Sequence, residues 1–239
     1  MKRDIRVYED IGSLNEGFTE LLLHLLSLYP TVHIALSGGS TPQVIFDYLS
    51  DHHQTSIPWE RIFFFWGDER CVPPDDKMSN YRMTNEHLLS RVEAIPKGNV
   101  FRILGENDPE QEAHRYGQLL DEQLPRQNNL PCFELVMLGL GEDGHTVSIF
   151  PDQIALWDNP NNCVVAEHPD TGMKRVTITG QIVNNARHVA FLVTGKNKAE
   201  KVEEILTRSA ASADYPATLV QPSDGVLYWL LDKEAGGKL

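Results

Sequence analysis

The chain has 239 residues, 41% of them hydrophobic and 23% charged, which is typical of a globular protein that buries a core without disulfides or metals. A formal net charge of −13 disfavours nucleic-acid binding, and it means that an anionic ligand would need a local cluster of cationic groups. No apolar run reaches the roughly 18 residues of a membrane span, and the first residues lack the apolar segment of a signal peptide. We therefore expect a cytoplasmic protein without membrane or nucleic-acid partners. We also expect the protein to be a monomer or a weak homodimer. Three widely spaced cysteines indicate neither a disulfide framework nor a zinc site.

Predicted strands and helices alternate along most of the chain. In chain order we expect a strand at 5–8, a helix from 11 to near 30, a strand at 32–36, a helix to about 49, a strand at 61–66, a helix at 80–92, a strand at 100–104, a helix at 109–124, strands at 133–138, 164–168, 176–179 and 189–194, a helix at 198–207 and a strand at 226–231. This alternation predicts one α/β domain over residues 1–239, with a mostly parallel, Rossmann-like sheet covered by helices on both faces.

The first candidate site follows the strand at 32–36 and reads Ser37-Gly38-Gly39-Ser40-Thr41. The glycines allow close backbone approach, and the next helix would offer free N–H groups to an anion. The same residues are equally typical of a plain turn with a Ser or Thr cap and Pro42 at the first helical position.

The second candidate site follows the aromatic strand at 61–66 and contains Asp68, Glu69 and Arg70. Either carboxylate could orient or assist a base, and the guanidinium could bind a phosphate with two hydrogen bonds. The alternative is a surface ion pair of little energetic value. The long connection that follows, through Ser79, Asn80 and Tyr81, is more typical of a binding loop than of a plain connector.

The third candidate site, Gly139-Leu140-Gly141-Glu142-Asp143-Gly144-His145, contains the pattern GxGxxG. Its internal carboxylates would repel a pyrophosphate, and it lies past the middle of the chain, so we reject a dinucleotide site. Histidine is the natural general base near neutral pH, and a neighbouring carboxylate holds its tautomer. Asp143 and His145 are therefore candidate catalytic residues, although a lone loop histidine is usually only a solvated side chain.

Cationic candidates complete the set. Lys196 and Lys198 follow a strand and Gly195, and Arg175 opens the strand at 176–179; each could equally be an ordinary solvated side chain. A Gly-x-Ser-x-Gly serine nucleophile and an HExxH metal motif are both absent. A hydrolase with these residues would most simply activate water directly, which suits a reactive ester such as a lactone.

In order and spacing, the segments SGGSTP, WGDER, LGLGEDGHTVSIFP, RVTIT and GKNKAEK together resemble the glucosamine-6-phosphate isomerase/6-phosphogluconolactonase family. The resemblance runs from about residue 32 to the final strand. It implies hydrolysis of 6-phospho-D-glucono-1,5-lactone to 6-phosphogluconate, in the oxidative pentose phosphate pathway, without a metal or other cofactor.

The resemblance also implies roles for single residues. His145 would be the general base, and Asp143 and Asp68 would orient it or the substrate hydroxyls. The phosphate would be held by cationic groups and by the first glycine turn, that is, by Arg70, Lys198, Ser37, Gly38, Gly39, Ser40 and Thr41. We keep Arg175 as a further candidate for binding the substrate or its phosphate, on its place at the head of a strand. Lys198, rather than Lys196, fits the family's Gly-x-x-Lys spacing.

Two alternatives remain beside this interpretation. The related glucosamine-6-phosphate deaminases follow DGH with a run that carries a catalytic Glu, where this chain has Phe150, and they have Asp-Glu-Tyr where it has Asp-Glu-Arg. A non-catalytic sugar-phosphate sensor would be expected to lack His145 and to carry a DNA-binding segment. Both comparisons favour the lactonase. At position 147 this chain has Val where the family often has Ala, and we expect the larger side chain to change only the local packing.

Overall fold

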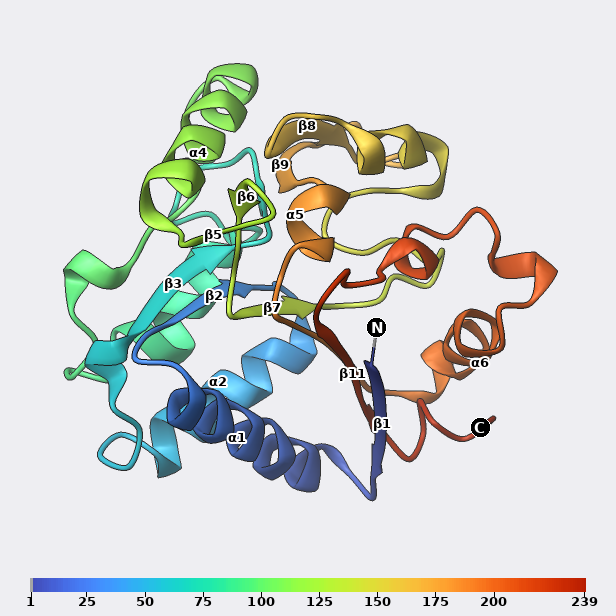
Figure 1. Cartoon of the computed structure of the whole chain (residues 1–239), viewed down its shortest axis with the longest axis horizontal. Coiled ribbons are helices and arrows are strands. Elements are labelled where there is room, and N and C mark those ends of the chain that lie inside the picture. The colour runs from blue at the N-terminus through green and yellow to red at the C-terminus, as the bar shows by residue number, and fades with distance from the viewer. Residues whose placement is uncertain (1) are drawn as a thin grey trace.

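A computed structural model describes residues 2–239 (Figure 1). Its centre is a parallel sheet of six strands in the order β1-β11-β10-β7-β2-β3. The strands are β1 (Lys2–Tyr8), β2 (Val32–Leu36), β3 (Ile62–Trp66), β7 (Leu135–Leu138), β10 (His188–Val193) and β11 (Val226–Asp232). The predicted α/β fold with a mostly parallel sheet is confirmed.

Helices cover both faces of the sheet (Figure 1). α1 (Ile11–Leu28) and α2 (Ser40–His52) lie on one face, and α4 (Pro109–Gln123) and α5 (Gly180–Asn184) lie on the other. The helix expected at 80–92 is shorter than predicted, with α3 (Asn80–Thr84) followed by π-helical turns at Asn85–Leu89. α6 (Ala199–Thr207) follows β10. Short 3-10 turns lie at Trp59–Arg61, Lys97–Asn99, Pro151–Asp158, Lys196–Lys198, Ala210–Ser212 and Pro216–Leu219.

A second, antiparallel sheet stands beside the carboxyl ends of the main strands. It consists of β4 (Asp68–Arg70), β9 (Lys174–Ile178) and β8 (Cys163–Glu167), with β9 in the middle. The sequence predicts β8 and β9 as strands but gives no sign of β4 or of this separate pairing. A small ribbon, β5 (Arg126–Gln127) with β6 (Leu130–Pro131), was also not predicted.

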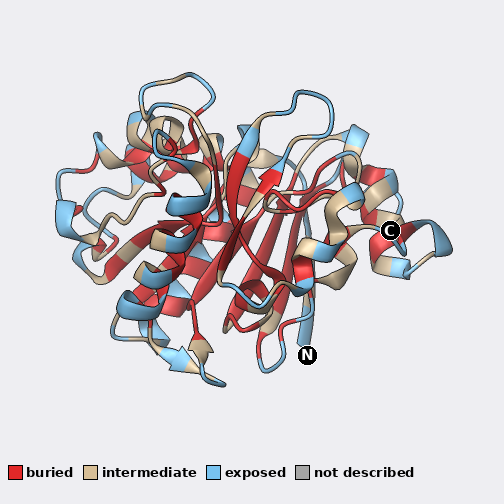
Figure 2. Cartoon of the chain, turned by 90° about the horizontal axis from the view of Figure 1, so that it is seen from above, coloured by how far each residue is buried: buried red, intermediate tan, exposed pale blue. Residues whose placement is uncertain are grey.

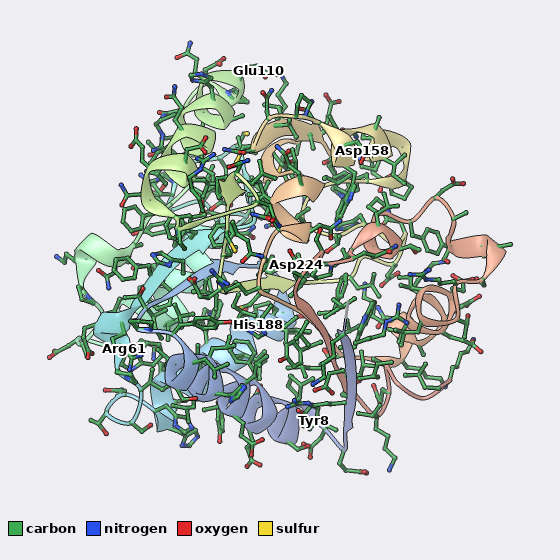
Figure 3. The ribbon with its side chains drawn as sticks, viewed as in Figure 1. Tyr8, Arg61, Glu110, Asp158, His188 and Asp224 are labelled. Atoms are coloured by element: carbon green, nitrogen blue, oxygen red, sulfur yellow. The ribbon has the colours of Figure 1, made fainter. Side chains whose placement is uncertain are left out.

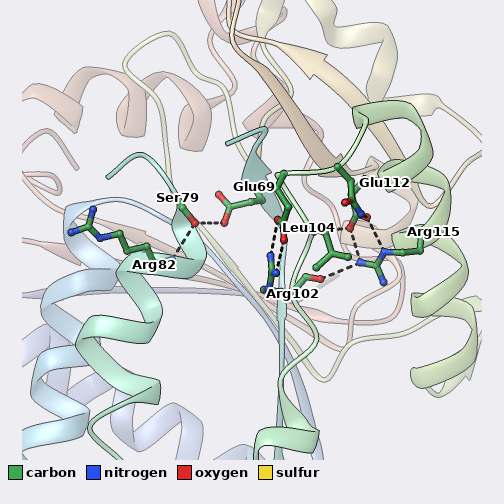
Figure 4. Close-up of polar contacts among 9 residues, drawn as sticks. Glu69, Ser79, Arg82, Arg102, Leu104, Glu112 and Arg115 are labelled. Carbon is green, nitrogen blue, oxygen red and sulfur yellow. Dashed lines mark hydrogen bonds and ion pairs between the residues drawn. The ribbon is translucent and has the colours of Figure 1, made fainter. Parts of the chain in front are cut away.

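The strand expected at Val100–Leu104 is absent, and that prediction is wrong. Only Val100 pairs with the sheet, through one parallel bridge to Phe64. The backbone N–H of Leu104 instead donates to the carboxylate of Glu112 in α4, at 2.7 Å (Figure 4). Pairing with the sheet therefore ends after the Phe101 N–H, which donates to the Phe64 carbonyl at 2.8 Å, and the backbone of Leu104 is bonded to α4 instead.

The core lies between the main sheet and its helices, and Figure 2 shows the strands buried and the outer helix surfaces exposed. α1 illustrates why the sequence folds this way: Leu14, Phe18 and Leu25 recur at helical spacing and are at most 1% exposed. Asp10 caps the helix by accepting the Ser13 N–H at 2.8 Å. Among residues 2–239, no helix is long and apolar enough to cross a bilayer, and the three cysteines are free thiols.

A buried histidine lies at the amino end of β10, at the opposite end of the sheet from the glycine turns. His188 (Figure 3) is 7% exposed, with Nε2 3.1 Å from the Tyr29 hydroxyl and Nδ1 3.4 Å from the Tyr228 hydroxyl. Burial lowers the pKa of His188 to about 4; nearby His24 and Arg187 act in the same direction, and Glu134 acts against it. The imidazole is therefore neutral in the folded protein at neutral pH.

Because of this histidine, we expect the free energy of unfolding to decrease at acidic pH. Because the folded-state pKa is depressed, the unfolded chain binds an additional proton once the pH falls below the ordinary value of 6.5. The free energy of unfolding should therefore decrease between pH 6.5 and about 4, by about 3 kcal/mol in total. Urea unfolding at pH 7.5, 5.5 and 4.5 measures this slope, and H188N should flatten it. An unchanged slope in H188N would show that other groups cause the acid sensitivity.

Candidate active site

The glycine turns come together because their strands are neighbours. β2 lies between β3 and β7, and β7 lies beside β10, so the turns after these strands share one edge of the sheet. Ligands in such sheets bind outside the carboxyl ends, where the chain direction of the connections reverses. A pocket of about 220 Å³ lies at this place. Its lining includes most of the residues predicted from the sequence, namely Ser37, Gly38, Gly39, Asp68, Arg70, His145, Arg175 and Lys198.

The structure separates the other predicted residues from this pocket. Ser40 and Thr41 line an adjoining hollow of about 260 Å³, which shares Gly38, Gly39 and Lys198 with the pocket. Asp143 does not line the pocket but contacts His145. Asn80 and Val147 are lining residues that were not selected as site residues, although both belong to segments that the sequence singled out.

Asp143 and His145 form a hydrogen-bonded pair. The Nδ1 atom of His145 lies 2.6 Å from Oδ1 of Asp143, and the same oxygen accepts the backbone N–H of His145 at 3.0 Å. A carboxylate only accepts, so Nδ1 carries a proton, and in the neutral form of the ring the lone pair lies on Nε2. Burial alone would raise the pKa of Asp143, but the hydrogen bonds and charge of His145 lower it to about 2. The pair therefore has the form of a base held by a charged carboxylate.

Gly141 explains why this loop is rich in glycine. A Cβ atom there would lie 2.1 Å from Nδ1 of His145 and 2.4 Å from Oδ1 of Asp143, so only glycine leaves room for the pair. Its N–H donates to the His145 carbonyl at 2.9 Å and closes the turn. The glycine at position 141 of the GxGxxG pattern thus makes room for the Asp–His contact. This agrees with our rejection of a dinucleotide site.

The first glycine turn opens α2 without a side-chain cap. The N-cap is Gly39, with φ of 103°, so neither Ser40 nor Thr41 caps the helix, and Pro42 lies at the third helical position. The Thr41 hydroxyl contacts that of Thr194 at 2.7 Å. Because no side chain satisfies the first N–H groups of this 13-residue helix, they are available to an anion. The structure therefore contradicts the plain capped turn.

Asp68 is a buried carboxylate at the pocket wall, only 5% exposed. Its Oδ2 atom accepts the Ser148 hydroxyl at 2.5 Å, and its backbone carbonyl accepts the side-chain amide of Asn80 at 2.9 Å. Asn80 in turn packs against the first turn: a Cβ at Gly38 would lie 1.9 Å from its Oδ1 atom. Asp68 and the first glycine turn are thus held together through Asn80.

Glu69 does not contribute to the pocket, so the idea that it assists a base is wrong. Adjacent residues of β4 point to opposite sides, and Glu69 is 2% exposed. Its carboxylate accepts four hydrogen bonds of 2.7–2.9 Å, from the Ser79 hydroxyl (Figure 4) and from the N–H groups of Arg70, Asn80 and Tyr81. Burial raises the pKa of Glu69, and these donors oppose the rise. Glu69 anchors the start of α3 and, with it, Asn80.

We expect E69Q to lower the free energy of unfolding by about 2 kcal/mol, because an amide nitrogen would face donors that now meet a carboxylate oxygen. The matched control is E86Q, which removes the charge from a surface pair between Arg82 and a side chain that is 51% exposed, and which should lower the free energy of unfolding far less than E69Q does. Chemical denaturation of both variants checks the difference. Equal losses would show that the four contacts of Glu69 do not stabilise the loop.

Three cationic side chains surround the pocket. Arg70 donates to the carbonyl of Met78 at 2.6 Å, and Arg175, 8% exposed, donates to Ser148 at 3.3 Å. Burial lowers the pKa of Arg175 and also that of Lys198, against the attraction of nearby carboxylates. The Nε atoms of both arginines are buried without a hydrogen-bond partner. This cluster is the local cationic environment that an anionic ligand requires in so acidic a protein.

Comparison with known proteins identifies the family. The model of the glucosamine-6-phosphate isomerases/6-phosphogluconolactonase family matches residues 11–229. The chain belongs to this family. A 6-phosphogluconolactonase of Treponema pallidum is 40% identical over 96% of this chain and 90% of its own length.

Solved structures of the family agree with this placement. The 6-phosphogluconolactonase of Trypanosoma brucei has a TM-score of 0.88 and 32% identity, covering 100% of this chain and 99% of its own. The 6-phosphogluconolactonase of Thermotoga maritima has a TM-score of 0.83 and 30% identity, and the match covers 97% of this chain and 100% of its own. A monomeric glucosamine-6-phosphate deaminase, 21% identical with a TM-score of 0.80, shares the fold.

Proposed function

We propose that this chain hydrolyses 6-phospho-D-glucono-1,5-lactone to 6-phospho-D-gluconate, a step of the oxidative branch of the pentose phosphate pathway. The observation that carries the proposal is the Asp143–His145 pair, whose imidazole lines a pocket that also holds three cationic side chains. The relatives named 6-phosphogluconolactonase support the same substrate. We also propose that the enzyme acts in the cytoplasm, as a monomer or weak homodimer, without nucleic-acid partners.

In this proposal His145 acts as general base and then as general acid. Its Nε2 atom removes a proton from a water molecule as the water oxygen attacks the lactone carbonyl carbon. When the tetrahedral intermediate collapses, the bond to the ring oxygen breaks, and His145 returns the proton to that oxygen. The products are a carboxylic acid, which ionises in water, and the freed hydroxyl. Asp143 stabilises the transient imidazolium and keeps Nε2 directed at the water.

The phosphate is assigned to the cationic side chains and to the open end of α2. Arg70, Arg175 and Lys198 supply the charge, and the turn from Ser37 to Thr41 supplies N–H and hydroxyl donors. Asp68 would accept a hydrogen bond from a sugar hydroxyl. Backbone N–H groups of a glycine turn would stabilise the oxyanion.

Phe150 argues against the deaminase alternative. In the sequence it stands at the position where the deaminase motif has its catalytic Glu; its side chain is 1% exposed, and its ring centroid lies 4.6 Å from that of His145. An apolar ring there offers no proton to an amino group. The presence of His145 likewise argues against a non-catalytic sensor.

The two enzymatic functions differ in their products. Purified protein should release acid from freshly prepared 6-phosphogluconolactone, measured with a pH indicator, and no ammonia from glucosamine 6-phosphate. Ammonia release without lactone hydrolysis would replace the lactonase assignment with the deaminase, and binding of either compound without turnover would support the sensor.

A further inference from the structure

Ser148 is a buried hydroxyl that the mechanism above does not use. It follows His145 by three residues and is 0% exposed. Between the two lies Val147, whose φ of 48° places a β-branched residue in the left-handed region. Such a conformation is unfavourable and persists only where the surrounding structure enforces it. The strained turn presents His145 to the pocket and Ser148 to the second sheet.

Asp68 and Arg175 share one face of that sheet. In the β4–β9 register, Asp68 pairs with Thr177 and Arg70 pairs with Arg175, so Asp68 and Arg175 are diagonal neighbours. Opposite charges at this spacing, both buried, would be expected to form a direct ion pair. The observed contacts differ: each of the two side chains is bonded to Ser148 instead.

The direction of these hydrogen bonds follows from chemistry. A guanidinium only donates and a carboxylate only accepts, so Arg175 donates to the Ser148 oxygen, and the Ser148 hydroxyl donates to Asp68. The backbone N–H of Ser148 is fixed separately, by the Thr177 hydroxyl at 3.2 Å. Ser148 is therefore held in place, and its hydroxyl bridges two groups of opposite charge by donating to one and accepting from the other.

We propose that Ser148 is a positioning residue that keeps Asp68 and Arg175 apart, so that each presents its remaining atoms to the substrate. The inference rests on the proposed function. Ser148 does not touch the reacting atoms; it acts through its two partners. Without its hydroxyl, Arg175 would turn onto Asp68, and the phosphate and a sugar hydroxyl would each lose a partner.

The test is S148A, with S148T as the variant that keeps the hydroxyl. We expect S148A to raise KM for the lactone and Kd for 6-phosphogluconate about 10-fold or more, with a smaller change in kcat. S148T should return both constants to within about threefold of wild type. The matched control is S50A, which removes another fully buried hydroxyl, bonded to the Asp47 carbonyl in α2. S50A should leave KM and Kd unchanged.

A double variant separates positioning from a general structural effect. In the R175M background no charge pair can form, so adding S148A should change Kd by less than about threefold. A full 10-fold loss in that background, or wild-type constants in S148A alone, would overturn the inference. Calorimetric binding of 6-phosphogluconate needs no turnover. Wild-type protein that binds it but does not hydrolyse the lactone would refute the proposed function, and the binding series would still decide the role of Ser148.

Discussion

H145Q is expected to lower kcat for lactone hydrolysis by about 10²- to 10⁴-fold, with little change in KM. In the proposed mechanism Nε2 of His145 is the base, held through the hydrogen bond of Nδ1 to Asp143 at the pocket wall, and glutamine supplies no base of comparable strength. Steady-state rates, corrected for spontaneous hydrolysis, measure the effect. H114Q, at an exposed position of α4, is the matched histidine control and should behave as wild type.

D143N should show part of the same loss, because an amide cannot stabilise the imidazolium and can reverse the tautomer. Since the pKa of Asp143 is lowered to about 2, the carboxylate stays charged throughout the usual range of assay pH. A wild-type kcat in H145Q would remove His145 from the mechanism. A wild-type kcat in D143N alone would show that the hydrogen bond between the two residues has no catalytic role.

K198M is expected to lower kcat/KM by about 10- to 100-fold, mainly through KM. Lys198 lines both the main pocket and the adjoining hollow at the start of α2, and in the proposed function its ammonium group binds the substrate phosphate. K196M provides a closely matched control, because Lys196 is two residues away, exposed, and outside both linings. It should change kcat/KM by less than about twofold.

Equal effects of K198M and K196M on kcat/KM would mean that the lysines attract the substrate only through the long-range electrostatic field of the protein. A loss in K198M that disappears at high salt would support the same conclusion, since screening acts mainly on exposed, distant charges. A large loss confined to K198M would instead support direct phosphate contact.

Sequence reasoning located the residues at the ends of parallel strands. The turns after β2, β7 and β10 carry glycine next to polar or charged side chains, and parallel strands bring such ends to one edge. Gly38 and His145 could therefore be selected from this pattern, whereas the choice of Lys198 over Lys196 depended on the resemblance to the family.

The remaining parts of the site depend on contacts that local pattern does not encode. Asp68 and Glu69 were equivalent in sequence, because β4 was not recognised as a strand whose adjacent residues face opposite ways. Ser148 and Asn80 gained their roles only through partners distant in the chain, at Asp68 and Gly38. The strand predicted at Val100–Leu104 failed for the same reason. The segment is apolar, as a strand would be, but the backbone N–H of Leu104 donates to Glu112, a contact that the local sequence does not show.

The most direct test of the account is the hydrolysis rate of freshly prepared 6-phosphogluconolactone by pure protein, measured beside unphosphorylated D-glucono-1,5-lactone and repeated with a metal chelator. We expect strong acceleration over spontaneous hydrolysis for the phosphorylated lactone, a kcat/KM at least about 100-fold lower without the phosphate, and no effect of chelator. If the protein does not accelerate hydrolysis of the phosphorylated lactone, it is not a 6-phosphogluconolactonase.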